Sequence, residues 1–291
     1  MKGKIVKAFL HKLNDLPIFD PARWPQRELL SRLAGASICA GFIVHRIFRF
    51  THYTGAPPQI LMNMPGIFRG DVPLAGIHPA VSDWHWLMWF AAWVIETGIF
   101  AGYILAFTTR SEARSVAKGF MEVVFPFTVA AIPIVITLTP MNFTGIWPPL
   151  LQAVADSLTA SSLKGVYWAG PFFRNWEPAF FLFLAIIICG GMLNLAGLLT
   201  LRKAFTITSE ARIFIRHGIF SKVRHPLYTG HFIMFFGYVM FHLYYYTALL
   251  YCLFVLGQYF RAGIEERKLM GVFPEYAGYM RDTGMFFPRF R

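Results

Sequence analysis

The chain has 291 residues, of which 56% are hydrophobic and 14% are charged, and its mean hydropathy is +0.49. Soluble domains carry about 25% charged residues, so this composition argues against a soluble globular protein and indicates several membrane crossings. The three cysteines lie in apolar runs without a CxxC motif or a Cys/His cluster, so we expect neither a disulfide framework nor a metal site. The net charge of +12 suits membrane topology and lipid headgroups, and we expect no nucleic-acid partner.

The first two thirds of the chain alternate apolar runs with polar or Pro/Gly-rich segments. Residues 1–30 place lysines beside apolar residues at helical spacing, which predicts an amphipathic helix lying on the membrane surface rather than a secretory signal. The segments 49–83 and 140–177 are predicted to be external and to pack against each other or against a protein partner. Four membrane spans are expected here, at residues 33–48, 84–107, 119–139 and 178–201.

The stretch Leu227–Tyr259 contains no formal charge. One spanning helix needs about 20 residues, so a stretch of about thirty fits a tight hairpin of two short spans better than one helix. With a bend near residues 242–244, the chain would return to the side it left. Residues 224–226 and 261–266 would then meet at one membrane face.

The basic residues support this six-span arrangement. If the N-terminus is cytoplasmic, 22 of the 27 Lys and Arg residues fall on the cytoplasmic side. The positive-inside rule therefore predicts cytoplasmic termini for an integral multi-pass protein of a bacterial inner membrane or of the endoplasmic reticulum. Arg46 and Arg49, beyond the first span, are the local exception.

The motif RHPLYTG at residues 224–230, preceded by HGIFSKV, resembles the signature of the isoprenylcysteine carboxyl methyltransferase family and its phospholipid methyltransferase relatives. In that family a helical hairpin, an Arg, a Glu-Glu pair and an FGxxYxxY-like segment follow. The resemblance divides the chain into residues 1–194, with the amphipathic segment and the first four spans in part, and a methyltransferase-like core at 195–291. The matching residues here are Arg261, Glu265, Glu266, Phe273, Tyr276 and Tyr279, with Pro274 where the family has Gly.

The resemblance implies S-adenosylmethionine (SAM) as cofactor, bound without a Rossmann glycine loop. Carboxylates suit the ribose, amino group or sulfonium of SAM, and aromatic rings offer it faces and hydroxyls. An arginine could hold a carboxylate or an anionic substrate, and His225 or a glutamate could act as a base. Candidate cofactor-binding residues are His225, Pro226, Tyr228, Gly230, Glu265, Glu266, Tyr276 and Tyr279, and candidate catalytic residues are Arg224, His225 and Arg261.

Each of these residues also has a purely structural interpretation. Arg224 can be a topological anchor, His225 can lie in a helix cap, and the tyrosines can be interfacial anchors. Arg261 and Glu265 are spaced as a helix-surface ion pair. Glu96 lies inside the predicted second span, where an ionised carboxylate costs at least about 2.5 kcal/mol. A substrate or proton-transfer role for Glu96 is one interpretation, and a protonated or hydrogen-bonded packing role is the one we favour.

These observations predict an all-α, polytopic membrane bundle with a cytoplasmic cofactor site. The leading hypothesis is a SAM-dependent integral membrane methyltransferase that acts on a lipophilic acceptor and contacts membrane lipids. An NADPH-dependent sterol-reductase-like enzyme shares a similar C-terminal pattern, although such proteins generally have more spans. A non-catalytic structural or transport subunit is the third hypothesis, without the inverted repeat that a transporter would show. Binding of SAM or NADPH distinguishes these classes.

Overall fold

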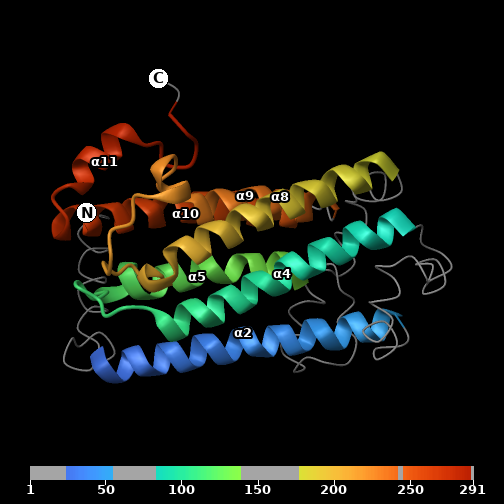
Figure 1. Ribbon diagram of the computed structural model, residues 1–291, viewed down its shortest axis with the longest axis horizontal. Coiled ribbons are helices and arrows are strands. Elements are labelled where there is room, and N and C mark those ends of the chain that lie inside the picture. The colour runs from blue at the N-terminus through green and yellow to red at the C-terminus, as the bar shows by residue number, and fades with distance from the viewer. Residues whose placement is uncertain (1–23, 55–82, 139–176, 242–244, 290–291) are drawn as a thin grey trace, which may run out of the picture.

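The structure is a computed structural model that describes residues 24–54, 83–138, 177–241 and 245–289. Within these ranges the long elements are helices that lie side by side along one axis (Figure 1). A short helix, α11 (Tyr276–Asp282), follows at one end of the bundle. The long helices are α2 (Trp24–Thr54), α4 (Asp83–Thr109), α5 (Gly119–Leu138), α8 (Glu177–Leu201), α9 (Pro226–Phe241) and α10 (Tyr245–Val272).

Five of the described helices are long and apolar enough to cross a membrane, namely α2, α4, α5, α8 and α10. The predicted fold class, a polytopic helical membrane protein, is therefore confirmed. With 16 residues, α9 reaches only about 24 Å, which is shorter than a hydrocarbon core of about 30 Å. It forms the first half of the predicted hairpin: α9 ends at Phe241, α10 begins at Tyr245, and the expected bend at 242–244 lies outside the described residues.

The predicted boundaries hold for α4, α5 and α8 but are wrong for α2, which extends well beyond the expected span at 33–48 at both ends. Glu28 and Arg32 in its first turns form an ion pair at 2.9 Å, so charged residues that end an apolar run continue the helix. The segment assigned to a surface helix and the first external segment thus each contribute residues to α2. The remaining parts of these predictions, and the segment 140–176, lie outside the described residues.

The connections between the helices meet at one end of the bundle. The Ser111 amide, after α4, donates to the Lys203 carbonyl at 2.8 Å, and the Lys268 ammonium donates to the Val116 carbonyl at 2.6 Å. The first turns of α2 and helix α11 also lie at this end (Figure 1). The described chain therefore starts and ends at the same end of the bundle, as the predicted hairpin of α9 and α10 requires.

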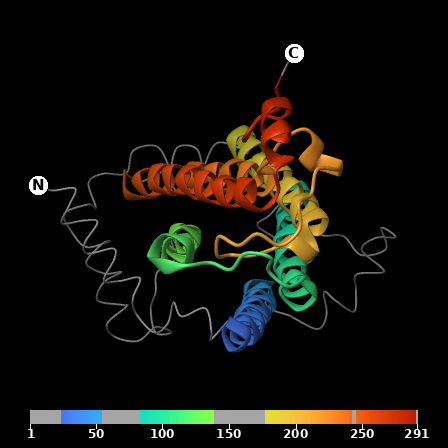
Figure 2. The same ribbon diagram turned by 90° about the vertical axis from the view of Figure 1, so that its left-hand side faces the viewer.

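Viewed along the bundle, α8, α9 and α10 gather on one side, α4 lies between them and α2, and α5 lies beside α10 (Figure 2). Glycines let α8 and α9 approach closely. A Cβ atom on Gly230 would lie 2.6 Å from the Asn194 nitrogen and 2.8 Å from the Gly190 carbonyl oxygen. Small residues at such positions are typical of helix pairs in membranes. The α8–α9 contact fixes the start of α9, where the RHPLYTG motif lies.

Candidate cofactor-binding site

The hairpin of α9 and α10 brings the RHP motif onto the glutamate pair. The Nε of Arg224 donates to Oε1 of Glu266 at 2.7 Å, and Nε2 of His225 lies 3.1 Å from the same oxygen. An ionised carboxylate only accepts, so this geometry favours the tautomer with a proton on Nε2. All three side chains are at least nine-tenths buried. The structure thus places together the two motifs whose convergence the hairpin predicted.

Glu265 forms the second half of this cluster. Its Oε1 accepts from the Tyr228 hydroxyl at 2.6 Å and from Nε of Arg261 at 3.0 Å. The guanidinium of Arg261 also lies over the Tyr228 ring, 5.2 Å from its centroid, and donates to the Ile207 carbonyl at 2.8 Å. The i,i+4 pair is therefore present, but it is buried and tied to α9 and to the loop before it, unlike a helix-surface ion pair.

His225 and Pro226 lie where α9 begins. Proline is favoured at the first helical position because its missing N–H would have no partner there. The His225 ring stacks on Tyr228, with the centroids 5.2 Å apart and the planes at 4°. We call the six side chains of Arg224, His225, Tyr228, Arg261, Glu265 and Glu266 the ionic cluster. Its two arginines balance its two glutamates, which buried charges require.

The chain after α11 lies along the RHP motif. Arg224 donates from Nη1 to the carbonyls of Met280, at 3.1 Å, and of Thr283. The backbone amides of Arg224 and His225 donate to the carbonyls of Gly284 at 2.9 Å and Met285 at 3.0 Å. Sequence reasoning missed this segment, since backbone carbonyls have no residue-type signature. The C-terminal segment therefore helps to hold the ionic cluster.

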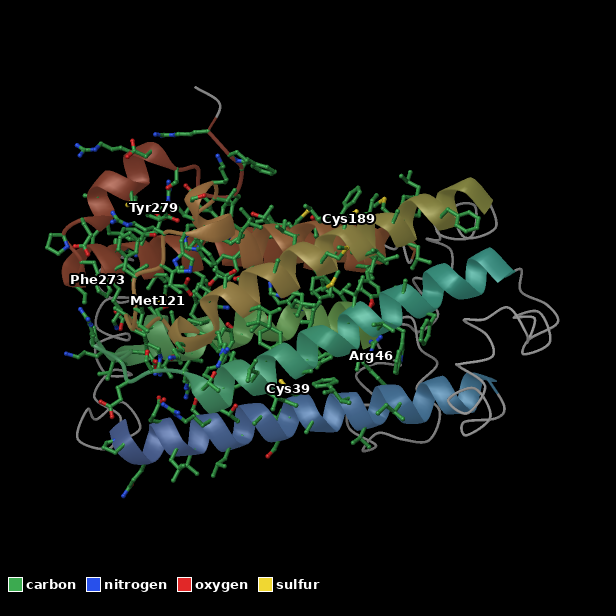
Figure 3. All side chains as sticks on the ribbon, viewed as in Figure 1. Cys39, Arg46, Met121, Cys189, Phe273 and Tyr279 are labelled. Carbon is green, nitrogen blue, oxygen red and sulfur yellow. The ribbon has the colours of Figure 1, made fainter. Side chains whose placement is uncertain are left out.

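Tyr276 and Tyr279 lie on α11 and pack on Phe214, with ring centroids 5.3 and 5.2 Å from it. The Tyr279 hydroxyl donates to the Phe220 carbonyl at 2.5 Å. Burial raises the pKa of Tyr279 to about 12, so its phenol stays protonated at neutral pH. Figure 3 shows Tyr279 above the end of the bundle where Phe273 follows α10. These contacts hold α11 against the loop between α8 and α9.

Gly230 has a different environment from the other candidates. The structure places it against α8, at the contact with Gly190 and Asn194 described above. This contact accounts for the glycine without any ligand. Its assignment to the cofactor stays a prediction.

A second buried ionic network went unnoticed in the sequence. Nη2 of Arg212 donates to Glu28 at 2.8 Å and also to Glu210, while Nε of Arg110 donates to Glu28 at 3.0 Å. The Arg212 side chain is fully buried. The network joins the first turns of α2 to the end of α4 and to the loop before the RHP motif. Its members lie far apart in the sequence, and no local spacing reveals them.

The ionic cluster has the chemistry that SAM requires. It combines two carboxylates with the aromatic rings of His225 and Tyr228. A sulfonium cation is stabilised by carboxylates and by aromatic faces. Both described contacts of Glu266 with Arg224 and His225 use Oε1, and Oε2 takes part in neither. The residues present therefore fit the cofactor.

Fold and site together define a multi-pass helical membrane protein with a buried ionic cluster at one end of its bundle. Residues 180–271 match the model of the isoprenylcysteine carboxyl methyltransferase (ICMT) family. The resemblance predicted from the sequence is confirmed, and it supports a membrane methyltransferase. The match includes the whole ionic cluster, begins before the predicted residue 195 and ends before Tyr276. No curated protein matches the chain.

Proposed function

We propose that this protein is a SAM-dependent membrane methyltransferase that acts on a lipophilic acceptor. The observation that carries the proposal is the convergence of Arg224 and His225 with Glu265 and Glu266 in one buried cluster, within the region that matches the ICMT family. A plain topological anchor would leave these side chains at the membrane surface. The burial of two ion pairs of balanced charge instead indicates a ligand-binding site.

The residues of the cluster have separable roles in this proposal. Glu265 and Glu266 hold the polar groups of the cofactor, and Tyr228 and His225 present ring faces to it. Arg224 and Arg261 act as positioning residues, because each donates to a glutamate and to a backbone carbonyl. When bound, SAM supplies an electrophilic methyl group. Transfer of such a group depends on alignment and exclusion of water, which a rigid buried cluster favours.

The acceptor reaches this site from the bilayer in our proposal. The cluster lies at the ends of apolar helices, and many of their large side chains are exposed on the bundle surface, such as Leu249, Leu253 and Leu256 of α10. Lipid chains are therefore the expected surroundings, and membrane lipids the expected contacts. The distribution of basic residues supports a cytoplasmic location of the site and of both termini in this proposal.

Binding and turnover of purified protein in detergent test the proposal. We expect titration calorimetry to show saturable binding of SAM and none of NADPH. Methyl transfer should rise with the chain length of the acceptor, since each buried methylene contributes about 0.8 kcal/mol. Binding of NADPH without SAM would support the reductase alternative. Equal turnover of short and long acceptors would contradict a lipophilic substrate.

A further inference from the structure

The C-terminal segment after α11, residues 283–289, turns back toward α9 (Figure 1). The turn depends on Gly284, because a Cβ atom there would lie 1.7 Å from the Phe287 carbonyl oxygen. The first carbonyls of the segment accept the two backbone amides before Pro226, as described above. The Phe286 carbonyl then accepts the Thr229 hydroxyl at 2.7 Å. The segment is therefore fixed against the first turn of α9.

The segment reaches the level at which the apolar part of the bundle begins. The centroid of the Phe286 ring lies 5.2 Å from that of Phe232 on α9 and 6.5 Å from that of Tyr259 on α10. Phe232 lies near the start of the uncharged stretch Leu227–Tyr259, and Tyr259 ends it. In a membrane protein, the ends of such a stretch mark the boundary between hydrocarbon and headgroups, where aromatic rings gather. The C-terminal segment therefore lies at this boundary.

Exposed aromatic side chains accompany the segment here. Phe287 is 71% exposed, Phe260 is 59% exposed and Tyr259 is 55% exposed. The rings of Tyr259 and Phe260 lie 5.8 Å apart, and Phe287 directly follows Phe286, which contacts Tyr259. An exposed apolar patch of this kind marks a contact with another surface. Because the patch continues from a membrane-spanning helix, α10, the adjoining surface is the bilayer.

Basic side chains dominate the exposed surface at this end of the bundle. Arg289 donates from Nη1 to the Arg281 carbonyl, so the two arginines are neighbours in space. The exposed Lys, Arg, Asp and Glu residues between positions 213 and 289 are Arg216, Lys222, Arg267, Arg281 and Arg289 against Glu275 and Asp282. An aromatic ring beside basic residues is typical of segments that bind anionic membranes, because the ring enters the acyl boundary while the cations contact headgroups.

We propose that the C-terminal segment docks on the surface of an anionic phospholipid leaflet. Phe287 enters the acyl boundary, and Arg281 and Arg289 contact the headgroups. Because carbonyls of the same segment accept the Arg224 and His225 amides, the docked leaflet also stabilises the part of the chain that carries the ionic cluster. The inference goes beyond the proposed function, since it holds whichever ligand the ionic cluster binds.

Photocrosslinking of full-length protein in mixed phosphatidylcholine and phosphatidylglycerol vesicles tests the contact. We expect Phe287→p-benzoylphenylalanine to give lipid adducts, identified by mass spectrometry. The same replacement of Leu256, which is 54% exposed on α10 within the apolar stretch, is the positive control. Met270 is the negative control: its side chain is 38% exposed, but it follows Tyr259 by eleven residues, about 17 Å along the helix axis.

Three results of this crosslinking would overturn the inference. The first is lipid adducts at Leu256 with none at Phe287. The second is equal yields of lipid adducts at Met270 and Phe287, which would remove the preference for the boundary. The third is an adduct of position 287 with a protein chain in place of lipid, which would assign the exposed ring to a protein partner.

The charge of the lipid has its own test. Arg281→Gln and Arg289→Gln should each lower the yield of lipid adducts at position 287 by up to about fivefold, the factor for about 1 kcal/mol per basic residue near an anionic surface. Arg267→Gln removes the same charge from an exposed position of α10 beyond the boundary and should leave the yield unchanged. Equal yields for wild-type positions 281 and 289 in vesicles with and without phosphatidylglycerol would overturn the anionic partner.

Hydrogen exchange of the unmodified protein measures the effect on the ionic cluster. The Arg224 and His225 amides donate to the C-terminal segment at 2.9 and 3.0 Å. They should exchange about fivefold more slowly in the mixed vesicles than in phosphatidylcholine alone, the factor of one arginine contact with the anionic surface. The Lys222 amide donates to the Ile219 carbonyl of its own loop and should exchange equally in both. Equal exchange of the Arg224 and His225 amides in both membranes would contradict the stabilising effect of the leaflet.

Discussion

Arg46 on α2 and Glu96 on α4 form an ion pair between two membrane-spanning helices. Their side chains are 23% and 11% exposed, and Figure 3 shows Arg46 on the side of α2 that faces α4. This one contact explains two exceptions in the sequence: a basic residue beyond the first span and a carboxylate inside the second. A pair in this position lowers the cost of both charges in an apolar environment. It supports the packing interpretation of Glu96.

The ion pair of Arg46 and Glu96 predicts how single and double variants at these positions differ in stability. Glu96→Gln should lower the free energy of unfolding by about 1–3 kcal/mol, because it leaves the Arg46 charge without its partner in a partly exposed site. Replacing both residues by Met should recover most of the loss. Thermal unfolding in detergent measures each step. A double variant that keeps its stability but loses methyl transfer would show that Glu96 has a functional role.

Gly230→Ala should destabilise the α8–α9 contact by about 1–3 kcal/mol, since the added methyl would lie 2.6 Å from the Asn194 nitrogen. Gly263→Ala on α10 is the control. A Cβ atom there meets nothing within 4 Å, so this change should stabilise the helix by up to about 1 kcal/mol. Midpoints of thermal unfolding report both effects. Equal stability of the two variants would contradict close packing at Gly230.

Arg212→Met should also destabilise the protein, by about 3–5 kcal/mol, because it leaves Glu28 and Glu210 with one buried cation fewer. Arg216→Met removes the same charge from an exposed position of the same loop and should have little effect. Denaturation followed by circular dichroism compares them. Similar midpoints for the two variants would show that the network around Glu28 adds little stability.

The distribution of basic residues makes a separate prediction about orientation. Tags at both termini should react with membrane-impermeant reagents only when these reagents have access to the cytoplasmic face of the membrane. A reporter within 140–177 should react from the outside. Labelling of intact and permeabilised vesicles measures this. Opposite accessibility of the two termini would mean an odd number of crossings and would contradict the hairpin.

Much of the fold follows from hydropathy, because lipid requires every backbone hydrogen bond to be satisfied within a helix. The break between α9 and α10 was predictable because the uncharged stretch Leu227–Tyr259 is too long for one span and too short for two long ones. The extent of α2 was not predictable in this way. Its ends continue through charged residues that are paired with distant parts of the chain, such as Glu28 with Arg110 and Arg212.

The candidate site was predictable to a similar degree. Residues 224–226 and 261–266 could be brought together by the hairpin alone, and the RHP and Glu-Glu motifs marked them. Local spacing could not reveal which charges pair. Arg224 pairs with Glu266, forty-two positions away in the sequence, whereas Arg261 pairs with Glu265, four positions away. Nor could it reveal that Arg224 also donates to two backbone carbonyls, that of Met280 in α11 and that of Thr283 just after it.

The central claim is that the ionic cluster binds SAM, and calorimetric titration of SAM into purified glutamate variants tests it most directly. Glu266→Gln and Glu265→Gln should each weaken SAM about ten- to a hundred-fold, the effect of losing a charge-assisted hydrogen bond of about 1.5–3 kcal/mol. Glu112→Gln, at an exposed position outside the cluster, should bind SAM as the wild type does. Because Glu266 also pairs with Arg224, only variants whose unfolding transition is preserved at the titration temperature are compared. Wild-type SAM affinity in both folded cluster variants would contradict the account.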